Sequence, residues 1–412
     1  MNTTVKKLKN QKHIALLVFL CAVIYFVSYV TRINYSAVLV EIMKSEGYTK
    51  AAASVPLTGL FIVYGIGQLI SGYLGDKFSP EKIIFTGLII TALMNLALPF
   101  SPNTGFMTIC WSINGFAQAL MWPPLVKILA KFLSPDDYKL NIVYIIFGSS
   151  IGTIFVYAVS PIVISFANWK YVFFGAAAIA VAVAFIWIST IFRIESKAED
   201  TENPYINVSV AKDGKKLSFT KSALILLSLI MIGNIFQGLL RDGISTWMPT
   251  YMSDTFGFNS SSAILTGVAL PIATMIISKF TARLYRNVLK NEAKCTSLFF
   301  FICTICCSVL YFVSSNPALS TVMLMSANAV THAINFTYTS ISVAKFERFG
   351  KTSFVTGAIN SSVYIGSALS TYGIAKITEI CGWSGTMLTW LIASILGLVV
   401  CIFTIKPFSR EL

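Results

Sequence analysis

Long apolar runs separated by short polar segments are the dominant pattern of this chain. The runs are about 20 residues or longer, and a helix of that length crosses the ~30 Å hydrocarbon core of a bilayer. They predict twelve helices, near residues 14–40, 53–74, 82–100, 104–132, 140–166, 169–192, 221–250, 261–282, 295–314, 317–345, 353–376 and 384–405. The pattern therefore predicts an all-α polytopic membrane protein embedded in a lipid bilayer.

One polar stretch is much longer than the others. Residues 193–220 are rich in charge, Asn and Ser, a composition typical of a flexible linker. The stretch divides the chain into an N-terminal half, residues 1–192, and a C-terminal half, residues 221–412, each with six predicted helices. We expect two six-helix halves joined by this linker.

Matching residues recur at nearly constant offsets in the two halves. Gly152 and Gly366 are 214 residues apart, and Arg32 and Arg241 are 209 apart. Such offsets are typical of a duplicated six-helix unit. Transporters built from two such halves bind substrate between them, near the middle of the membrane.

Composition and charge narrow the class of protein further. Only 12% of residues are charged and the mean hydropathy is +0.74, whereas soluble proteins carry about 25% charged residues. Of 31 lysines and arginines, 25 fall on the side of the predicted helices that carries both termini and residues 193–220, and four on the other. Positive loops face the cytoplasm, so we expect cytoplasmic termini and no nucleic-acid partner for the net charge of +14. With short ends and no targeting signal, we expect a bacterial inner membrane.

The eight cysteines fall almost entirely within apolar runs. Cys303, Cys306 and Cys307 have a spacing seen in metal sites, but no His or carboxylate lies near them in the sequence. We interpret them as packing residues, and we expect no metal, cofactor or disulfide framework.

Two arginines lie deep within apolar runs, Arg32 in the first predicted helix and Arg241 in the seventh. A charge at membrane depth costs at least about 2.5 kcal/mol, so such residues usually face a protein interior and have a function. Asp242 follows Arg241 directly, and a step of one residue turns about 100° around a helix. We therefore expect both guanidinium groups to lack a carboxylate partner and to bind a doubly charged anion.

Polar and aromatic residues at helical spacing form stripes that we expect to line the same cavity. The alternative, in which each of these residues only makes hydrogen bonds between helices, is open for every one of them. For His332 that alternative is a hydrogen bond to a backbone carbonyl. The residues are Tyr25 and Tyr29 beside Arg32, Tyr64 with Gln68, Gln118 with Trp122, His332, and Tyr364.

Two groups of motifs carry a family resemblance. The segment from Gly72 to Lys82 resembles the loop between the second and third helices of the major facilitator superfamily, which implies a gating role for Asp76 and Lys77. The run from Asn114 to Pro124 (NGFAQALMWPP) resembles the organophosphate:phosphate antiporters, the glycerol-3-phosphate and hexose-phosphate transporters. The residues around both arginines resemble the corresponding segments of that family, and the likeness implies that both arginines bind the substrate phosphate.

The chain departs from the glycerol-3-phosphate transporters at three positions. Gln68 and Ser149 stand where those transporters have a lysine and a histidine, and Ile33 replaces another lysine. We expect Ser149 and Gln68 to line the site, but glycerol-3-phosphate specificity does not follow.

The resemblance implies a monomer that exchanges an organic phosphate for inorganic phosphate by alternating access, and not an enzyme. One alternative is a proton- or sodium-coupled symporter of a carboxylated substrate such as a sugar acid, with Asp242 or His332 carrying the proton. Another is a membrane sensor of sugar phosphate, against which the short ends of the chain argue. A drug exporter is disfavoured because paired arginines repel cations.

Overall fold

The structure, a computed structural model, describes residues 4–202, 220–289, 291–313, 316–343, 346 and 352–411. Most of the expected linker, residues 203–219, lies outside the described residues. The first half contains α1 (Gln11–Glu46), α2 (Lys50–Lys77), α3 (Pro80–Ala97), η1 (Leu98–Phe100), α4 (Thr104–Ala119), α5 (Trp122–Phe132), α6 (Pro135–Phe166) and α7 (Lys170–Glu195). The second half contains α9 (Lys221–Phe256), α10 (Ser260–Thr266), α11 (Ala269–Leu284), η2 (Tyr285–Leu289), α12 (Glu292–Phe312), α13 (Pro317–Phe336), η3 (Thr337–Ser342) and α15 (Thr352–Glu411).

The described helices account for the twelve predicted membrane spans. Among the described residues, nine segments are long and apolar enough to cross a membrane by length and composition. One of them, in α15, holds two spans separated by a kink at Gly382, where φ is 67°. The α4–α5 pair and α13 supply the remaining two. The fold class predicted from the sequence is confirmed.

The helices begin and end where local chemistry favours it. Side chains accept hydrogen bonds from exposed N–H groups at several N-termini, for example Thr49 at α2 and Asn259 at α10. The arginine-bearing helices α1 and α9 are each 36 residues long, and each ends at a left-handed glycine, Gly47 or Gly257, with φ of 69°. Glycine adopts that conformation without steric cost, so the two helices stop in the same way.

The predicted helix over residues 104–132 is interrupted. α4 ends at Ala119 and α5 begins at Trp122, with Pro123 and Pro124 in its first turn. Proline lacks an N–H and is tolerated at a helix start, because the first N–H groups have no partner within the helix. The double proline therefore starts a new helix rather than kinking a continuous one.

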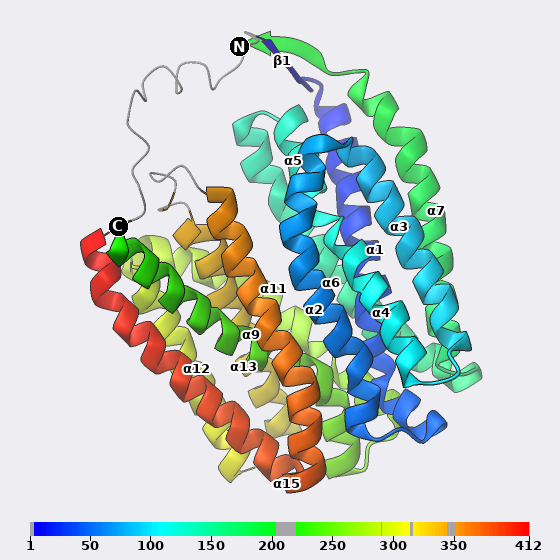
Figure 1. The fold of residues 1–412 in the computed structure, drawn as a ribbon, viewed down its shortest axis with the longest axis vertical. Helices are drawn as coiled ribbons and strands as arrows, with labels where there is room; N and C mark the ends of the chain where they lie inside the picture. The colour runs from blue at the N-terminus through cyan, green and yellow to red at the C-terminus, as the bar shows by residue number, and fades with distance from the viewer. Residues whose placement is uncertain are drawn as a thin grey trace.

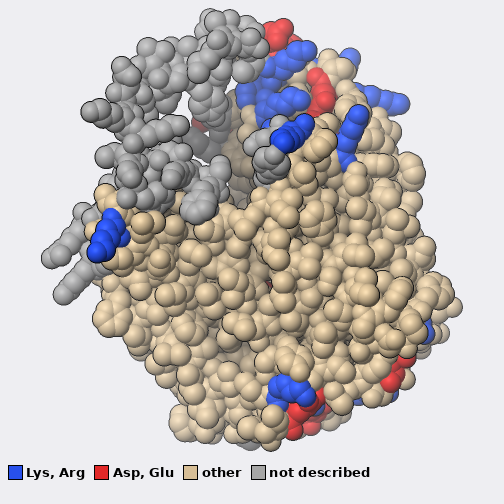
Figure 2. Space-filling view, viewed as in Figure 1, with Lys and Arg blue, Asp and Glu red and all other residues tan. Residues whose placement is uncertain are grey.

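Helices of the first half lie on one side of the molecule and helices of the second half on the other (Figure 1). Large apolar side chains point outward along these helices; Phe166 is 87% exposed and Ile380 is 79% exposed. The space-filling view shows a broad uncharged belt, with Lys, Arg, Asp and Glu gathered at its two ends (Figure 2). Such a belt is the surface that a bilayer covers.

α1 packs closely against α6, and α9 packs closely against α15, with a glycine at each of the two crossings. A Cβ at Gly152 of α6 would meet the carbonyl oxygen of Phe26 of α1 at 2.6 Å. A Cβ at Gly366 of α15 would collide with the carbonyl oxygen of Ile235 of α9. Phe26 and Ile235 are 209 residues apart, the same offset as the two arginines. The glycines let the arginine-bearing helices approach their neighbours closely at matching depths.

A small β-ribbon departs from the all-helical expectation. Strand β1 (Thr4–Lys7) pairs antiparallel with β2 (Glu199–Glu202), so the start of the chain lies beside the segment that follows α7. Lys7 Nζ also donates to the carbonyl oxygens of Ala130 and Leu133, both at 2.7 Å. The ribbon was not predicted because its residues are polar and its pairing spans almost 200 positions of sequence.

Candidate functional site

Arg32 of α1 lies between two tyrosine rings. Its guanidinium carbon is 4.4 Å from the centre of the Tyr29 ring and 5.1 Å from that of Tyr64. Tyr29 lies one turn earlier on α1, whereas Tyr64 comes from α2. Within the described part of the chain, Arg32 pairs with no carboxylate. The stacked rings hold the cation in place without neutralising it.

Arg241 of α9 is paired, contrary to the expectation from the sequence. Its Nε donates to Oδ1 of Asp242 at 2.8 Å and its Nη2 donates to Oδ2 at 2.6 Å. The 100° step between neighbouring helix residues separates their Cβ directions, but the long arginine side chain folds across to reach the carboxylate. Ser367 of α15 also donates a hydrogen bond to Oδ2 of Asp242. The prediction that Asp242 points away from Arg241 was wrong.

The two arginines, one from each half, are connected through the contacting rings of Tyr64 and Tyr364. The ring of Tyr364 on α15 lies 6.0 Å from the guanidinium carbon of Arg241. The rings of Tyr64 and Tyr364 are 4.5 Å apart, so they join α2 to α15 at this point. The four helices therefore place two guanidinium groups around one small aromatic enclosure.

Other predicted site residues surround this enclosure to different degrees. Tyr25 lies 5.3 Å from Tyr29 and 4.6 Å from Trp122, measured between ring centres, so all three belong to one aromatic group. Gln68 lies one turn from Tyr64 on α2, and its Nε2 is buried with no hydrogen-bond partner among the described residues. Its amide is thus a donor available to a bound molecule.

Gln118 and Ser149 are engaged within the protein. The Gln118 amide donates from Nε2 to Oγ1 of Thr31 at 2.8 Å and accepts at Oε1 from Ser28 at 2.5 Å. The Ser149 hydroxyl donates to the carbonyl of Ile146 in its own helix at 2.6 Å. Both arrangements correspond to the alternative considered above, in which polar residues bind neighbouring helices or their own backbone.

Two asparagines brace the arginine-bearing helices in equivalent ways. Asn114 of α4 donates to the carbonyl of Thr31, the residue before Arg32, at 3.1 Å. Asn328 of α13 donates to the carbonyl of Arg241 at 3.0 Å. His332 lies one turn beyond Asn328 on α13, near Arg241 and Asp242.

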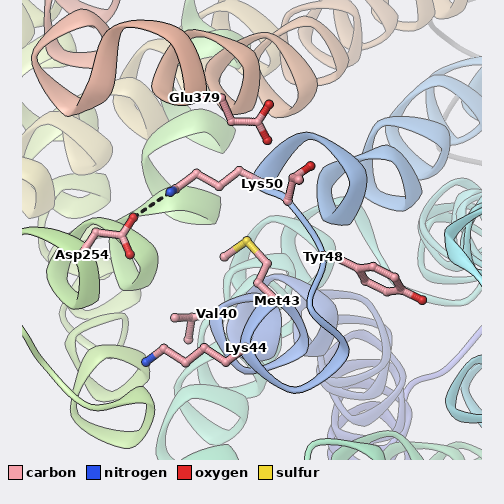
Figure 3. Close-up of a pocket in the computed structure, with 8 residues that line it drawn as sticks. Val40, Met43, Lys44, Tyr48, Lys50, Asp254 and Glu379 are labelled. Atoms are coloured by element: carbon pink, nitrogen blue, oxygen red, sulfur yellow. Dashed lines mark ion pairs between the residues drawn. The ribbon is translucent and has the colours of Figure 1, made fainter.

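A second polar cluster, drawn in Figure 3, lies where α1 ends and α2 begins, at the end of the bundle away from β1 (Figure 1). There a cavity of about 320 Å³ is lined by Val40, Met43, Lys44, Tyr48, Thr49, Lys50, Asp254 and Glu379. Figure 3 shows Lys50 reaching Asp254 across the gap between the two halves. None of the predicted binding residues lines this cavity. The predicted gating residues lie on α2 far from it: Lys77 ends the helix and is exposed, while the side chain of Asp76 lies outside the described residues.

The sequence did not single out Ser367, which completes the Arg241–Asp242 pair. Its only sequence signal is its position three residues after Tyr364, which places both on one face of the helix. Serines are frequent on the packing faces of membrane helices, so this spacing alone did not distinguish it.

Comparison with known proteins places the chain in a family. Residues 21–371 match the family model of the Major Facilitator Superfamily, and the chain belongs to that superfamily of transporters. It is 25% identical to the glycerol-3-phosphate transporter of Bacillus subtilis (strain 168) over 63% of this chain and 61% of that protein. It is 22% identical to the membrane sensor protein UhpC of Salmonella typhimurium (strain LT2) over 91% and 87% of the two chains. These relatives confirm the motif resemblance to the organophosphate:phosphate antiporter family.

A solved structure agrees with the fold. The inward-facing, unoccupied structure of a bacterial homolog of the human lysosomal transporter Spinster has a TM-score of 0.76 with 12% identity, over 98% of this chain and 99% of the other. The matched region spans about three fifths of the length of the Bacillus subtilis transporter.

Proposed function

We propose that this protein exchanges an organic phosphate, of the sugar-phosphate or glycerol-phosphate type, for inorganic phosphate. The observation that carries the proposal is that Arg32 and Arg241, one from each half, lie against the contacting rings of Tyr64 and Tyr364. Guanidinium is permanently charged, and its planar fork matches phosphate oxygens. The likeness to a glycerol-3-phosphate transporter supports the same substrate class.

The proposed cycle follows from where the charges lie. Residues 1–192 and 221–412 act as two units joined by the 193–220 linker. A phosphate oxyanion that contacts both arginines attracts the two units toward each other, whereas the empty site leaves Arg32 unneutralised. Closure is therefore favoured by bound anion, and the return step requires an anion as well. We place the protein in a bacterial inner membrane as a monomer, with both termini and the linker cytoplasmic.

The test is counterflow in proteoliposomes. Vesicles loaded with phosphate take up labelled phosphate, whereas empty vesicles do not, and a protonophore leaves the exchange unchanged. Equal uptake into empty vesicles, or collapse of uptake with the protonophore, contradicts exchange and favours an ion-coupled symporter.

The arginines are tested by Arg32→Lys and Arg241→Lys. A hydrogen bond to a charged group contributes about 1.5–3 kcal/mol. Loss of the fork should therefore raise the half-saturating phosphate concentration about tenfold or more. Arg193→Lys, at the exposed end of α7, is the matched control and retains wild-type exchange. Wild-type half-saturation in both site variants removes the site assignment.

A sensor of sugar phosphate is the second candidate, because the likeness to the sensor UhpC extends over 91% of this chain. A sensor of this fold binds phosphate esters with dependence on Arg32 and Arg241 but shows no exchange. Binding without counterflow in the vesicle assay therefore identifies it.

A further inference from the structure

The pairing of Arg241 bears on which charge state of substrate the site accepts. Arg241 uses Nε and Nη2, one edge of its fork, to hold Asp242, and Ser367 fixes Asp242 from α15. The side chains of Arg241 and Asp242 are each only 13% exposed. A guanidinium has five N–H donors, so three remain on Arg241 for a substrate: both N–H groups of Nη1 and the second N–H of Nη2. Arg32 keeps its fork free of carboxylates within the described part of the chain.

The charged and titratable groups that face this pair come from five helices. They are Arg32, Tyr25 and Tyr29 of α1, Tyr64 of α2, Arg241 and Asp242 of α9, His332 of α13, and Tyr364 of α15. With the tyrosines and His332 in their neutral forms, two guanidinium charges and one carboxylate charge leave a single net positive charge. A singly charged oxyanion makes the closed site neutral. A dianion leaves an uncompensated negative charge in a buried place, which is strongly disfavoured.

Resting on the proposed function, we infer that Asp242 is a resident counter-anion that makes this transporter select the singly charged form of its phosphate substrates. Asp242 competes with the substrate for the guanidinium of Arg241. It thereby lowers the affinity of the site for the doubly charged form of the substrate relative to the singly charged form. Asp242 is thus a specificity-determining residue. It differs from the proton carrier of the symporter alternative, because it needs no change of protonation to act.

Two probes of fixed charge and similar shape test the inference at pH 8. Methanesulfonate is a monoanion and sulfate a dianion throughout the relevant pH range, and binding of either raises the thermal stability of the purified protein by mass action. Wild-type protein should respond to methanesulfonate at a concentration at least about tenfold lower than to sulfate. Asp242→Asn leaves two net positive charges and should reverse the order.

Asp137→Asn is the matched control, because Asp137 also accepts a serine hydrogen bond, from Ser134 at 2.6 Å, but lies in the first turn of α6. It should keep the wild-type order of the two anions. Absence of a monoanion preference in the wild type, or its persistence in Asp242→Asn, overturns the inference.

A measurement on the wild type alone tests the same selection by charge, and its outcome does not depend on whether Asp242→Asn folds. The second pKa of a phosphate monoester is about 6, so its monoanion becomes scarce above that pH. The total methyl phosphate concentration needed for half-maximal stabilisation should rise at least about tenfold between pH 6 and pH 8, with no such rise for methanesulfonate. A constant methyl phosphate requirement overturns the inference. Failure of the proposed function is distinct, since it is seen as absence of phosphate exchange in proteoliposomes.

Discussion

Lys50 and Asp254 form an ion pair that joins the two halves of the chain, with Nζ and Oδ2 2.9 Å apart (Figure 3). Beside it, Glu379 accepts a hydrogen bond from the backbone N–H of Ala51 at 2.7 Å, and Lys44 donates to Ser253 at 3.1 Å. All three contacts connect the α1–α2 region to α9 or α15. They lie at one end of the bundle, so they must break before the halves separate there.

Removal of this ion pair should loosen that end. A partly exposed pair contributes about 0.2–1 kcal/mol, so Lys50→Ala should raise the open population by up to about fivefold. Hydrogen exchange of peptides covering residues 44–51 and 253–260 measures the change, and both should take up deuterium faster. Lys9→Ala, which removes a 3.1 Å pair with Glu199 at the other end, is the control. Two results would contradict a role of this ion pair in holding the halves together. One is unchanged hydrogen exchange in Lys50→Ala. The other is failure of the swapped pair, Lys50→Asp with Asp254→Lys, to restore protection from exchange.

Alanine at either glycine of the paired crossings should destabilise the fold. In Gly366→Ala the new methyl collides with the carbonyl of Ile235, and backbone cannot move aside as a flexible side chain does. Overpacking of this kind costs about 1–3 kcal/mol, and thermal unfolding in detergent measures it. Gly373→Ala is the control on the same helix, because no atom lies within 4 Å of its added Cβ. Equal melting temperatures for the two variants would show that α9 and α15 are packed more loosely.

The fold was largely predictable because the bilayer restricts the choice. Apolar runs of membrane-spanning length have to be helices, so twelve spans followed from hydropathy. The positions of Gly152 and Gly366 also carried spatial information, since both serve the same kind of crossing. The break after Ala119 and the β1–β2 ribbon were missed, because one depends on local backbone choice at two prolines and the other on pairing of distant polar segments.

For the predicted binding residues, neighbours on one helix were easier to predict than contacts between side chains. Helical spacing placed Tyr29 beside Arg32 and grouped Tyr25 with Tyr29, as the structure does. Spacing along one helix says nothing of where a long side chain folds, so the Arg241–Asp242 pair was not anticipated. The same limit applies to Gln118, because its partners Ser28 and Thr31 lie on another helix.

The amide of Gln118 should matter for stability. Gln118→Met keeps the length of the side chain but leaves the hydroxyls of Ser28 and Thr31 without this partner in a buried place. A buried polar group that loses its partner costs about 1–3 kcal/mol, so the melting temperature should fall by several degrees. Gln237→Met is the comparison in α9: among the described residues it removes one donated bond, to the carbonyl of Thr331 at 3.1 Å, and should cost less. A larger loss at Gln237 than at Gln118 would contradict this account.

Tyr364 should control binding through its ring rather than its hydroxyl. The ring lies 4.5 Å from Tyr64 and 6.0 Å from the guanidinium carbon of Arg241, so it holds the two halves and one cation together. Tyr364→Phe keeps the aromatic face and should raise the half-saturating phosphate concentration less than about threefold. Tyr364→Ala removes about 0.5–1.5 kcal/mol of contact with the Tyr64 ring and about 0.5–2 kcal/mol of contact with the arginine, and should raise that concentration about fivefold or more. Counterflow in proteoliposomes measures both. Equal losses in the two variants would instead assign the role to the hydroxyl, as a hydrogen-bond donor to the phosphate.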